Sequence, residues 1–414
     1  MNVPIDHRPA VLAIFVLTYV GLAVGRIPGL RVNRTAIALM GAIGMMIVSG
    51  CTPMELASVV SWPTLLLLFG FFVISAQLRL SGFYDWMAAG ISGWAGGPPR
   101  FLLLLIAVSA ALSSFLNHDV VCYVLTPVVA SALLKRGLDP VPFLVALAAS
   151  SNIGSAATLI GNPQNMMIAT VAGLGFARYL AWCFVPVAFG LACTFALTRM
   201  GNLNRPAPPR LRDVEPPELP CSLDRYHMTK GLVVLALVIA LLFTRIPREI
   251  TVLVAASIHL LSTKFRSEDL LAVVDWQILV LFSSLFVVGG TFQATGYGEA
   301  LVQWMQGIGF NPATPLNETL LTTGLSILIN NAPAVVLLVK IVPMTHATAA
   351  YVLAMANSFA GSAILMASVA NIIVVQQARR LGIVVSFWDF TRRGAPIALA
   401  SLAGLVGWAV LMGA

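Results

Sequence analysis

Charged residues are scarce in this chain of 414 residues: 10% are Asp, Glu, Lys or Arg, while 59% are hydrophobic and the mean hydropathy is +0.91. A soluble protein of this length could not cover so much apolar surface, so the shortage of charge indicates an integral membrane protein. The net charge of +8 does not predict nucleic-acid binding, because the basic residues lie between hydrophobic runs, where they set orientation in a membrane.

Motifs for catalysis, redox chemistry and nucleotide binding are missing. The five cysteines have neither CxxC nor metal-ligand spacing, as is typical of small core residues: Cys51, Cys122, Cys183, Cys193 and Cys221. No Walker A motif is present, so the chain is no primary pump by itself, although an ATPase subunit could couple to it. No nucleophile or metal set accompanies the one intramembrane His–Asp pair, so we expect no enzyme and no cofactor.

Long hydrophobic runs are what the chain does contain. Spanning lengths occur at 9–25, 35–50, 62–79 and 180–198, two shorter legs at 100–116 and 120–134, and one overlong run at 140–176. Residues 199–230 differ, with six Pro and six Lys or Arg, which predicts a solvated linker. We therefore expect an all-α membrane protein with a transmembrane unit at 1–198, a linker at 199–230 and a second transmembrane unit at 231–414.

The second unit repeats the first. Residues 59–83, VVSWPTLLLLFGFFVISAQLRLSGF, match 273–297, VVDWQILVLFSSLFVVGGTFQATGY, and 31–42 match 245–256 with the same offset. SSFLNHD meets SILINNA (326–332), and LAASSNIGSAATLIGNPQN (147–165) meets LAMANSFAGSAILMASVAN (353–371). Asn165 with Asn371 is the clearest polar match of the last pair. The pattern predicts two diverged copies of one unit.

Charge placement predicts how the copies are oriented. With the amino terminus outside and the linker cytoplasmic, all but five of the 24 Lys and Arg residues fall inside, the exceptions being Arg8, Arg178, Arg245, Arg248 and Lys340. Each copy then crosses the membrane five times, so the second copy is inverted. Because the legs around residue 117 are short, we expect a re-entrant hairpin there. Inverted repeats with helices broken at the midplane are typical of secondary transporters, and we expect this one in the plasma (inner) membrane.

The hairpin tips carry polar groups that are rare at membrane depth. The first has Asn117, His118 and Asp119, and the second has Asn330 and Asn331. Asp119, with or without His118, is expected to bind a cation or proton while the amides hold a solute. The alternative is that Asp119 only caps the following helix.

The two interrupted spans offer further groups. Gly154 and Gly161 permit non-helical backbone, and Pro163 suits the first turn of a new half-helix. Neutral oxygens and amides surround them: Ser151, Asn152, Ser155, Thr158 and Asn165 in the first copy, and Asn357, Ser358, Ser362, Ser368 and Asn371 in the second. The alternative is that the small residues merely allow close helix packing.

These motifs resemble the ion transporter superfamily, and most closely its anion permease branch of arsenite permeases (ArsB), NhaD-type antiporters and citrate-transporter-like proteins. The resemblance lies in FLNHDVVCYVLTP, NIGSAATLIGNPQN, VVDWQILVLFSSLFVVGG and INNAPAVVLL. It implies two inverted repeats, each with a re-entrant hairpin and a broken helix, and commonly a homodimer. The implied site for substrate and coupling ions comprises Asn117, His118, Asp119, Asn152, Gly154, Thr158, Asn162, Asn165, Asn330, Asn331, Ser358, Gly361, Ser362 and Asn371, with sodium, if used, near Asn117, Asn152 and Asn165.

The first tip departs from the dicarboxylate carriers of that superfamily, which have Ser-Asn-Thr there. A carboxylate beside a dianionic substrate would repel it, whereas a neutral oxyacid, a cation or a proton meets no such penalty. The first hypothesis is therefore proton-linked export of a small oxyacid resembling arsenite or antimonite. A sodium/proton antiporter is second, and sodium-coupled uptake of an organic anion such as citrate or a dicarboxylate is third. A channel, whose flux would not saturate, is the alternative of another class.

Overall fold

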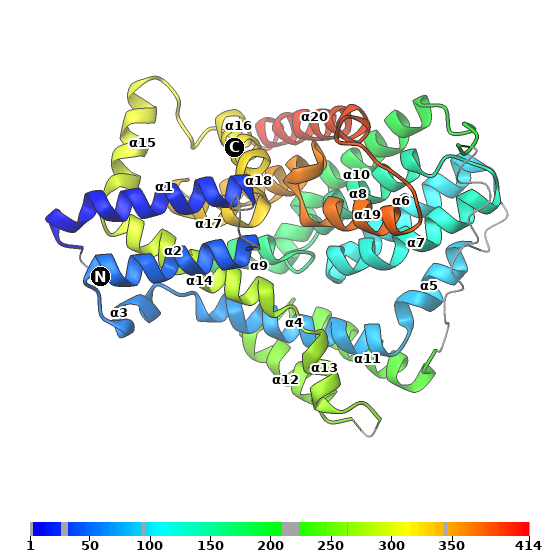
Figure 1. Cartoon of the computed structure of the whole chain (residues 1–414), viewed down its shortest axis with the longest axis horizontal. Helices are drawn as coiled ribbons and strands as arrows, with labels where there is room; N and C mark the ends of the chain where they lie inside the picture. Colours follow the sequence, from blue (N-terminus) through cyan, green and yellow to red (C-terminus); the bar gives the residue numbers. More distant parts are fainter. Residues whose placement is uncertain are drawn as a thin grey trace.

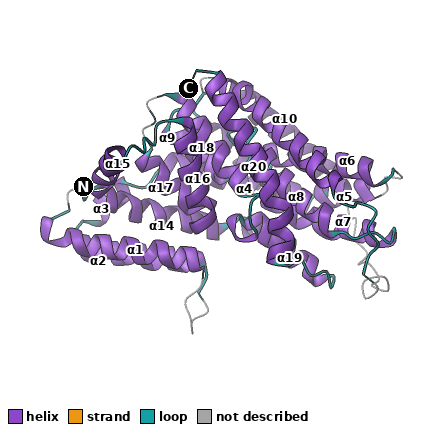
Figure 2. Cartoon of the chain, turned by 90° about the horizontal axis from the view of Figure 1, so that it is seen from above, coloured by secondary structure: helices purple, strands orange, loops and turns teal. Residues whose placement is uncertain are grey.

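Helices make up the fold of this computed structural model, which describes residues 3–25, 32–92, 96–208, 223–244, 246–262, 264–342, 344 and 346–413. No β-strand is present in these ranges (Figure 2). Seven of the described helices are long and apolar enough to cross a membrane. The sequence therefore predicted the all-α membrane class correctly.

The described part of the first half contains ten α-helices, whose arrangement is drawn in Figure 1. They are α1 (Arg8–Val24), α2 (Arg34–Ser49), α3 (Pro53–Ser58), α4 (Trp62–Leu80), α5 (Phe83–Ser92), α6 (Pro98–Phe115), α7 (His118–Lys135), α8 (Val141–Ser155), α9 (Pro163–Val171) and α10 (Phe176–Met200).

Ten described α-helices follow in the same order in the second half. They are α11 (Arg225–Leu241), α12 (Arg248–Leu260), α13 (Ser267–Val273), α14 (Trp276–Gln293), α15 (Tyr297–Gly307), α16 (Pro315–Ile329), α17 (Asn331–Ile341), α18 (Ala347–Ala360), α19 (Val369–Arg380) and α20 (Phe387–Leu411).

Contacts between the halves are reciprocal. Helix α2 packs on α14, and α12 packs on α4; likewise α7 contacts α19, and α17 contacts α9. Exchange of partners in this way is what a two-fold rotation between two similar units produces.

Helices extend a short way into both ends of the range expected for the linker, 199–230. Helix α10 continues to Met200, and α11 begins at Arg225, where the side chain of Asp224 accepts a hydrogen bond from the His227 N–H and caps the helix. Residues 209–222, with Cys221, and also Arg26, Arg31 and Arg245 lie outside the described residues.

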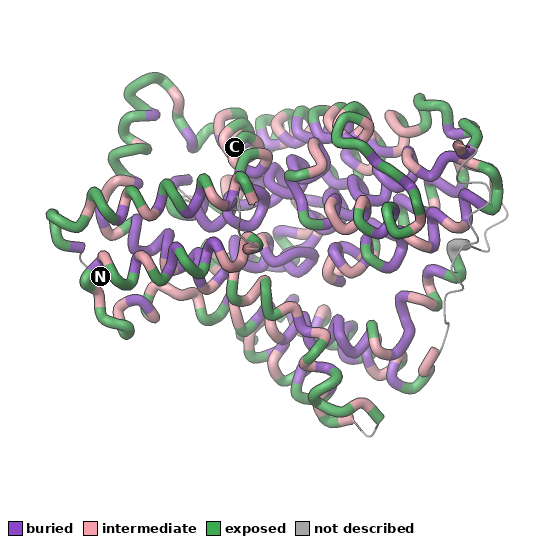
Figure 3. The backbone as a smooth tube through the Cα atoms, in the orientation of Figure 1, coloured by how far each residue is buried: buried purple, intermediate pink, exposed green. Residues whose placement is uncertain are grey.

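Burial divides the helices into an inner and an outer set (Figure 3). Helix α8 is buried from Pro142 to Ser155, and α18 from Ala350 to Ala360. Outer helices instead expose large apolar side chains, such as Leu17, Ile47, Phe184 and Leu399. An apolar outer surface of this kind suits lipid rather than water, and the inner helices carry the polar groups described next.

Candidate functional site

The first hairpin, α6–α7, ends in the polar cluster that the sequence singled out. Asn117 follows the end of α6 and caps α7, because its side-chain oxygen accepts a hydrogen bond from the Asp119 N–H at 2.9 Å. The side-chain cap of α7 is therefore Asn117 rather than Asp119. His118 and Asp119 are 5% and 9% exposed, and His118 Nε2 lies 3.5 Å from Asp119 Oδ1. Within the described residues, that carboxylate oxygen accepts no hydrogen bond, so His118 is its one polar contact there and its capacity to accept hydrogen bonds is unfilled.

The second hairpin, α16–α17, has a strained tip. Asn330 has φ 77° and ψ 158°, a region that is essentially restricted to glycine, and no other non-glycine residue among those described has a positive φ. Its side-chain amide donates a hydrogen bond to the Met366 carbonyl at 3.2 Å. Asn331 follows with a buried side-chain oxygen that has no partner in the described structure. Strain and unpaired polar groups cluster at functional sites.

The two expected helix breaks are present. The first separates α8 from α9, where Asn162 caps α9 and Pro163 occupies its first turn. The second separates α18 from α19 and holds the short 3-10 helix Leu365–Ala367. Each break is closed by one amide: Asn165 donates to the carbonyls of Ser155 and Thr158, and Asn371 donates to those of Gly361 and Ile364.

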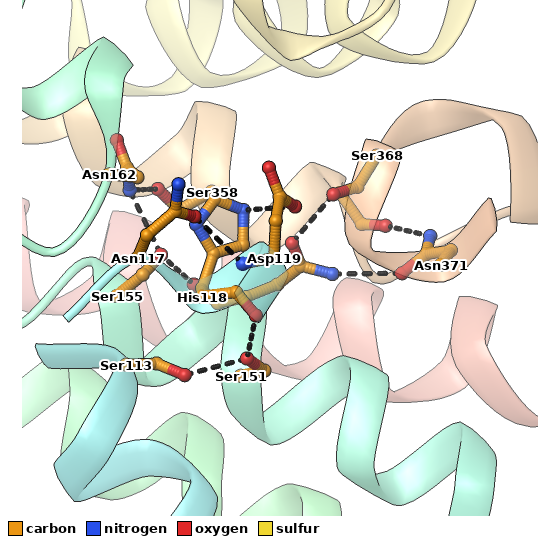
Figure 4. Close-up of polar contacts among 12 residues, drawn as sticks. Ser113, Asn117, His118, Asp119, Ser151, Ser155, Asn162, Ser358, Ser368 and Asn371 are labelled. Carbon is orange, nitrogen blue, oxygen red and sulfur yellow. Dashed lines mark hydrogen bonds and ion pairs between the residues drawn. The ribbon is translucent and has the colours of Figure 1, made fainter. Parts of the chain in front are cut away.

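Side chains of the two helix breaks are also hydrogen-bonded to each other (Figure 4). Asn162 Nδ2 donates to Ser358 Oγ at 3.2 Å, and Ser368 Oγ donates to Asn152 Oδ1 at 2.9 Å. In the aligned repeats Asn162 is equivalent to Ser368 and Asn152 to Ser358, so one contact occurs twice in reciprocal form. Asn152 also donates to Asn371 Oδ1 at 3.0 Å. The result is a polar network buried between α8 and α18.

Each hairpin is tied to the broken helix of its own half. Ser113 and Ser151 share a hydrogen bond of 2.6 Å between α6 and α8, and Ser326 donates to Asn357 Oδ1 at 2.7 Å between α16 and α18. Ser151 also donates to the His118 carbonyl at 3.3 Å. These contacts fix the tips against the network.

Two cavities meet at Asp119. One, of about 570 Å³, is bounded by α4, the first hairpin tip and the α13–α14 junction. The other, of about 680 Å³, is bounded by both hairpin tips, the end of α1, the start of α2, and α19. Asp119, Asp275 and Gln277 line both. Both volumes lie in the usual range for small-molecule sites.

The structure separates the expected residues into three groups. The tip residues line these cavities: Asn117, His118, Asp119, Asn330 and Asn331. A second group forms the buried polar network: Asn152, Asn162, Asn165, Ser358, Gly361 and Asn371. Ser362 is buried beside Gly361, and its hydroxyl has no partner among the described residues. The third group, Gly154 and Thr158, packs on α6. The Thr158 hydroxyl donates a hydrogen bond to the Ser114 carbonyl, and Ser114 Oγ donates one to the Gly154 carbonyl at 2.9 Å.

The residues suggested for sodium differ in their surroundings. Asn117 lines a cavity, whereas the side-chain amides of Asn152 and Asn165 are engaged in hydrogen bonds within the network. The described residues contain no group of three His, Cys, Asp or Glu side chains placed to hold a metal ion.

Sequence reasoning missed several lining residues: Arg34, Arg79, Gln164, Asp275 and Gln277. Asp275 shows why. A single carboxylate before an apolar helix is typical of an N-cap, and Asp275 does accept a hydrogen bond from the Ile278 N–H at 3.2 Å. One signal was available in the sequence. The first copy has the uncharged Ser61 at the position equivalent to Asp275, so the negative charge is specific to the second copy.

Known proteins resemble this chain over most of its length. An uncharacterized transporter of Mycobacterium tuberculosis is 30% identical over 94% of this chain and 95% of its own length. The silicon efflux transporter LSI3 of Oryza sativa subsp. japonica is 27% identical over 90% and 91%. The putative transporter arsB of Dictyostelium discoideum is 36% identical over 39% of this chain and 29% of its own length.

A solved structure shares the fold. The crystal structure of the YdaH transporter of Alcanivorax borkumensis has a TM-score of 0.62 and 14% identity, with 98% of each chain covered. The model of the citrate transporter family, CitMHS, matches residues 13–354. The chain is therefore a multi-pass membrane transporter that belongs to the citrate transporter (CitMHS) family, within the anion permease branch of the ion transporter superfamily.

Proposed function

We propose that this protein is a secondary active transporter that exports a small uncharged oxyacid, such as arsenous or antimonous acid, in exchange for protons. The observation that carries the proposal is the position of Asp119. It lies at a hairpin tip between two cavities and is 9% exposed; one carboxylate oxygen accepts no hydrogen bond in the described structure and lies 3.5 Å from His118 Nε2. A carboxylate in this position can take up and release a proton as the site changes its exposure.

The charges around the site favour an uncharged solute. Asp119 and Asp275 line both cavities, and two carboxylates would repel a dianion. An uncharged acid with several hydroxyl groups can instead donate to carboxylates and amides, including Asn117 and Asn331. The names of two relatives agree with this class, since silicic acid and arsenous acid are both small, hydroxylated and uncharged near neutral pH.

Sodium-coupled uptake of an organic anion is the second candidate. Arg34 lines the larger cavity and Arg79 the smaller one. An arginine in each cavity could attract a carboxylate, although Arg34 Nε is also 3.3 Å from the Leu22 carbonyl and Arg79 lies over the Tyr123 ring.

The proposed topology follows from the charge distribution. The amino terminus is outside, the linker is cytoplasmic, and each half has five spans and a re-entrant hairpin, with the second half inverted. Reciprocal packing of α2 on α14 and of α12 on α4 supports a two-fold relation between the halves. We place the protein in the plasma membrane as a homodimer, with an ATPase subunit as an additional partner to be tested by co-purification.

The test is transport by the purified protein in liposomes. Arsenite, antimonite, silicic acid, citrate, succinate and sodium are each supplied with an imposed pH or sodium gradient. We expect oxyacid flux driven by the pH gradient, and we expect Asp119→Asn to abolish the flux or its pH dependence. Asp6→Asn, which changes an exposed carboxylate, is the matched control. Sodium-driven succinate uptake with inert oxyacids would contradict the proposal, as would Asp119→Asn behaving like the control.

A further inference from the structure

Helix α16, the first leg of the second hairpin, has a polar face inside the protein. Glu318, Thr319, Thr322 and Ser326 are all at most 4% exposed. At about 100° per residue, these four positions fall within roughly 100° of the helix circumference. They therefore form one continuous stripe, which we call the α16 polar face.

Most of this face lacks hydrogen-bond partners. Glu318 Oε1, Thr319 Oγ1 and Thr322 Oγ1 are buried without a partner among the described residues. Ser326 is the exception, because it donates to Asn357 Oδ1, and the Asn357 side-chain nitrogen is itself unpaired in the described structure. Several unsatisfied polar groups in a row inside a membrane protein indicate water or an ion.

The α16 polar face leads away from the cavities. Its inner end is Ser326, beside Asn357 and the hairpin tip. Its outer end is Glu318 in the first turn, 12 positions before Asn330 and thus roughly 18 Å along the helix. None of its residues lines either cavity, and the part of α14 that lines them ends at Phe282. Since α15 and α16 follow the far end of α14, Glu318 lies on the side of the site away from both cavities.

Glu318 forms no ion pair with any described residue. The titratable or charged groups on the elements packed against α16 are Arg8 and Tyr19 of α1, Lys340 of α17, Tyr351 of α18, and Asp389, Arg392 and Arg393 of α20. None of them forms an ion pair with Glu318 in the described part of the chain. A carboxylate buried without a partner is costly, and uptake of a proton removes that cost.

We propose that Glu318 is a second proton-binding site and that the α16 polar face conducts the coupling proton between the candidate site and the face of the membrane away from both cavities. The carboxylate takes a proton from water at one end and returns it to water held by the threonine hydroxyls. The four polar side chains are spread over eight positions, roughly 12 Å along the helix, so they form a row along which a proton can move. The inference rests on the proposed coupling to protons.

The experiment follows protons and solute separately. Full-length protein is reconstituted in liposomes that contain a fluorescent pH indicator, an arsenite gradient is imposed, and lumenal pH and arsenite are both recorded. We expect Glu318→Gln to lose the proton signal while arsenite still moves down its own gradient. Thr322→Val, which replaces the hydroxyl by a methyl of similar size, is expected to slow the proton signal. Glu299→Gln, on the exposed surface of α15, is expected to match wild type.

The outcomes separate the two proposals. A proton signal in Glu318→Gln equal to wild type overturns this inference and leaves the proposed function standing. If Glu318→Gln unfolds at a lower temperature than wild type, Thr322→Val decides, and a normal proton signal from that variant overturns the inference. Wild-type protein that moves no oxyacid overturns the proposed function. A sodium gradient then drives the assay, and equal proton signals from wild type and Glu318→Gln again overturn the inference.

Discussion

Asn165 and Asn371 occupy the same place in the two helix breaks. Each side-chain amide donates to the carbonyls of the residues ten and seven positions earlier, at 3.3 and 3.0 Å for Asn165 and at 2.6 and 2.9 Å for Asn371. Carbonyls released by a broken helix have no water to bond at this depth, so another group must satisfy them. One asparagine in each half performs that task, and both are fully buried.

Removing either amide is expected to destabilise the protein. Asn165→Ala or Asn371→Ala leaves two buried carbonyls short of a donor, at a cost of about 1–3 kcal/mol for each unsatisfied group. The measurement is thermal unfolding of the detergent-purified protein. Asn317→Ala is the control, because its amide donates to the Asn311 carbonyl at an exposed position. Equal losses in all three variants would show that the breaks do not depend on these amides.

Gly154 tests the packing interpretation of the first broken span. A Cβ atom at this position would lie 2.7 Å from the Ala110 carbonyl oxygen, so Gly154→Ala must push α8 away from α6. We expect a loss of about 1–3 kcal/mol in the free energy of unfolding. In Gly90→Ala the new methyl meets nothing within 4 Å, and this exposed helical position should be neutral or stabilised by up to about 1 kcal/mol. Denaturant titration compares the two, and a neutral Gly154→Ala contradicts the close-packing role.

Asp224 is expected to make the folding stability of the protein fall at acidic pH. The Lys264 ammonium, 2.6 Å from Asp224 Oδ2, and the His227 N–H hold the pKa of this carboxyl well below its usual range. A depressed folded-state pKa stabilises the protein above the unfolded-state value of about 3.9, and this stabilisation is lost as the pH falls below it. Melting temperatures measured from pH 7 down to pH 3 should therefore fall more steeply for wild type than for Asp224→Asn.

An exposed ion pair serves as the control in the same pH series. Glu268 Oε2 lies 2.5 Å from a guanidinium nitrogen of Arg266, and both side chains are about three-quarters exposed. Exposed ion pairs contribute little to folding stability. Glu268→Gln should retain the wild-type acid dependence. A curve for Asp224→Asn that overlays wild type would mean that the Asp224–Lys264 contact does not link α11 to the loop after α12 in solution.

Local sequence located the first helix break and the first hairpin tip. Pro163 after Gly161 and Asn162 located the first break, and the run of polar residues at 117–119 located the first tip. Both patterns are conspicuous because helix-breaking and polar residues are energetically costly within a membrane-spanning segment. Asn330 could be assigned to a tip, but its positive φ could not be foreseen, since an asparagine in sequence does not indicate that conformation; in the fold its side-chain amide bonds the Met366 carbonyl.

Composition and order along the chain therefore determined the class of this protein, its repeat and the positions of its breaks, since each follows from hydrophobic length and from residues that a helix in lipid tolerates poorly. Only the tertiary structure decided which polar groups meet. Asp275 beside Asp119, the paired contacts Asn162–Ser358 and Ser368–Asn152, and the unpaired stripe beginning at Glu318 all join residues far apart in sequence or depend on what surrounds one helix face. Packing brings these residues together, and the hydrophobic periodicity of a single segment does not predict which other segment it will contact.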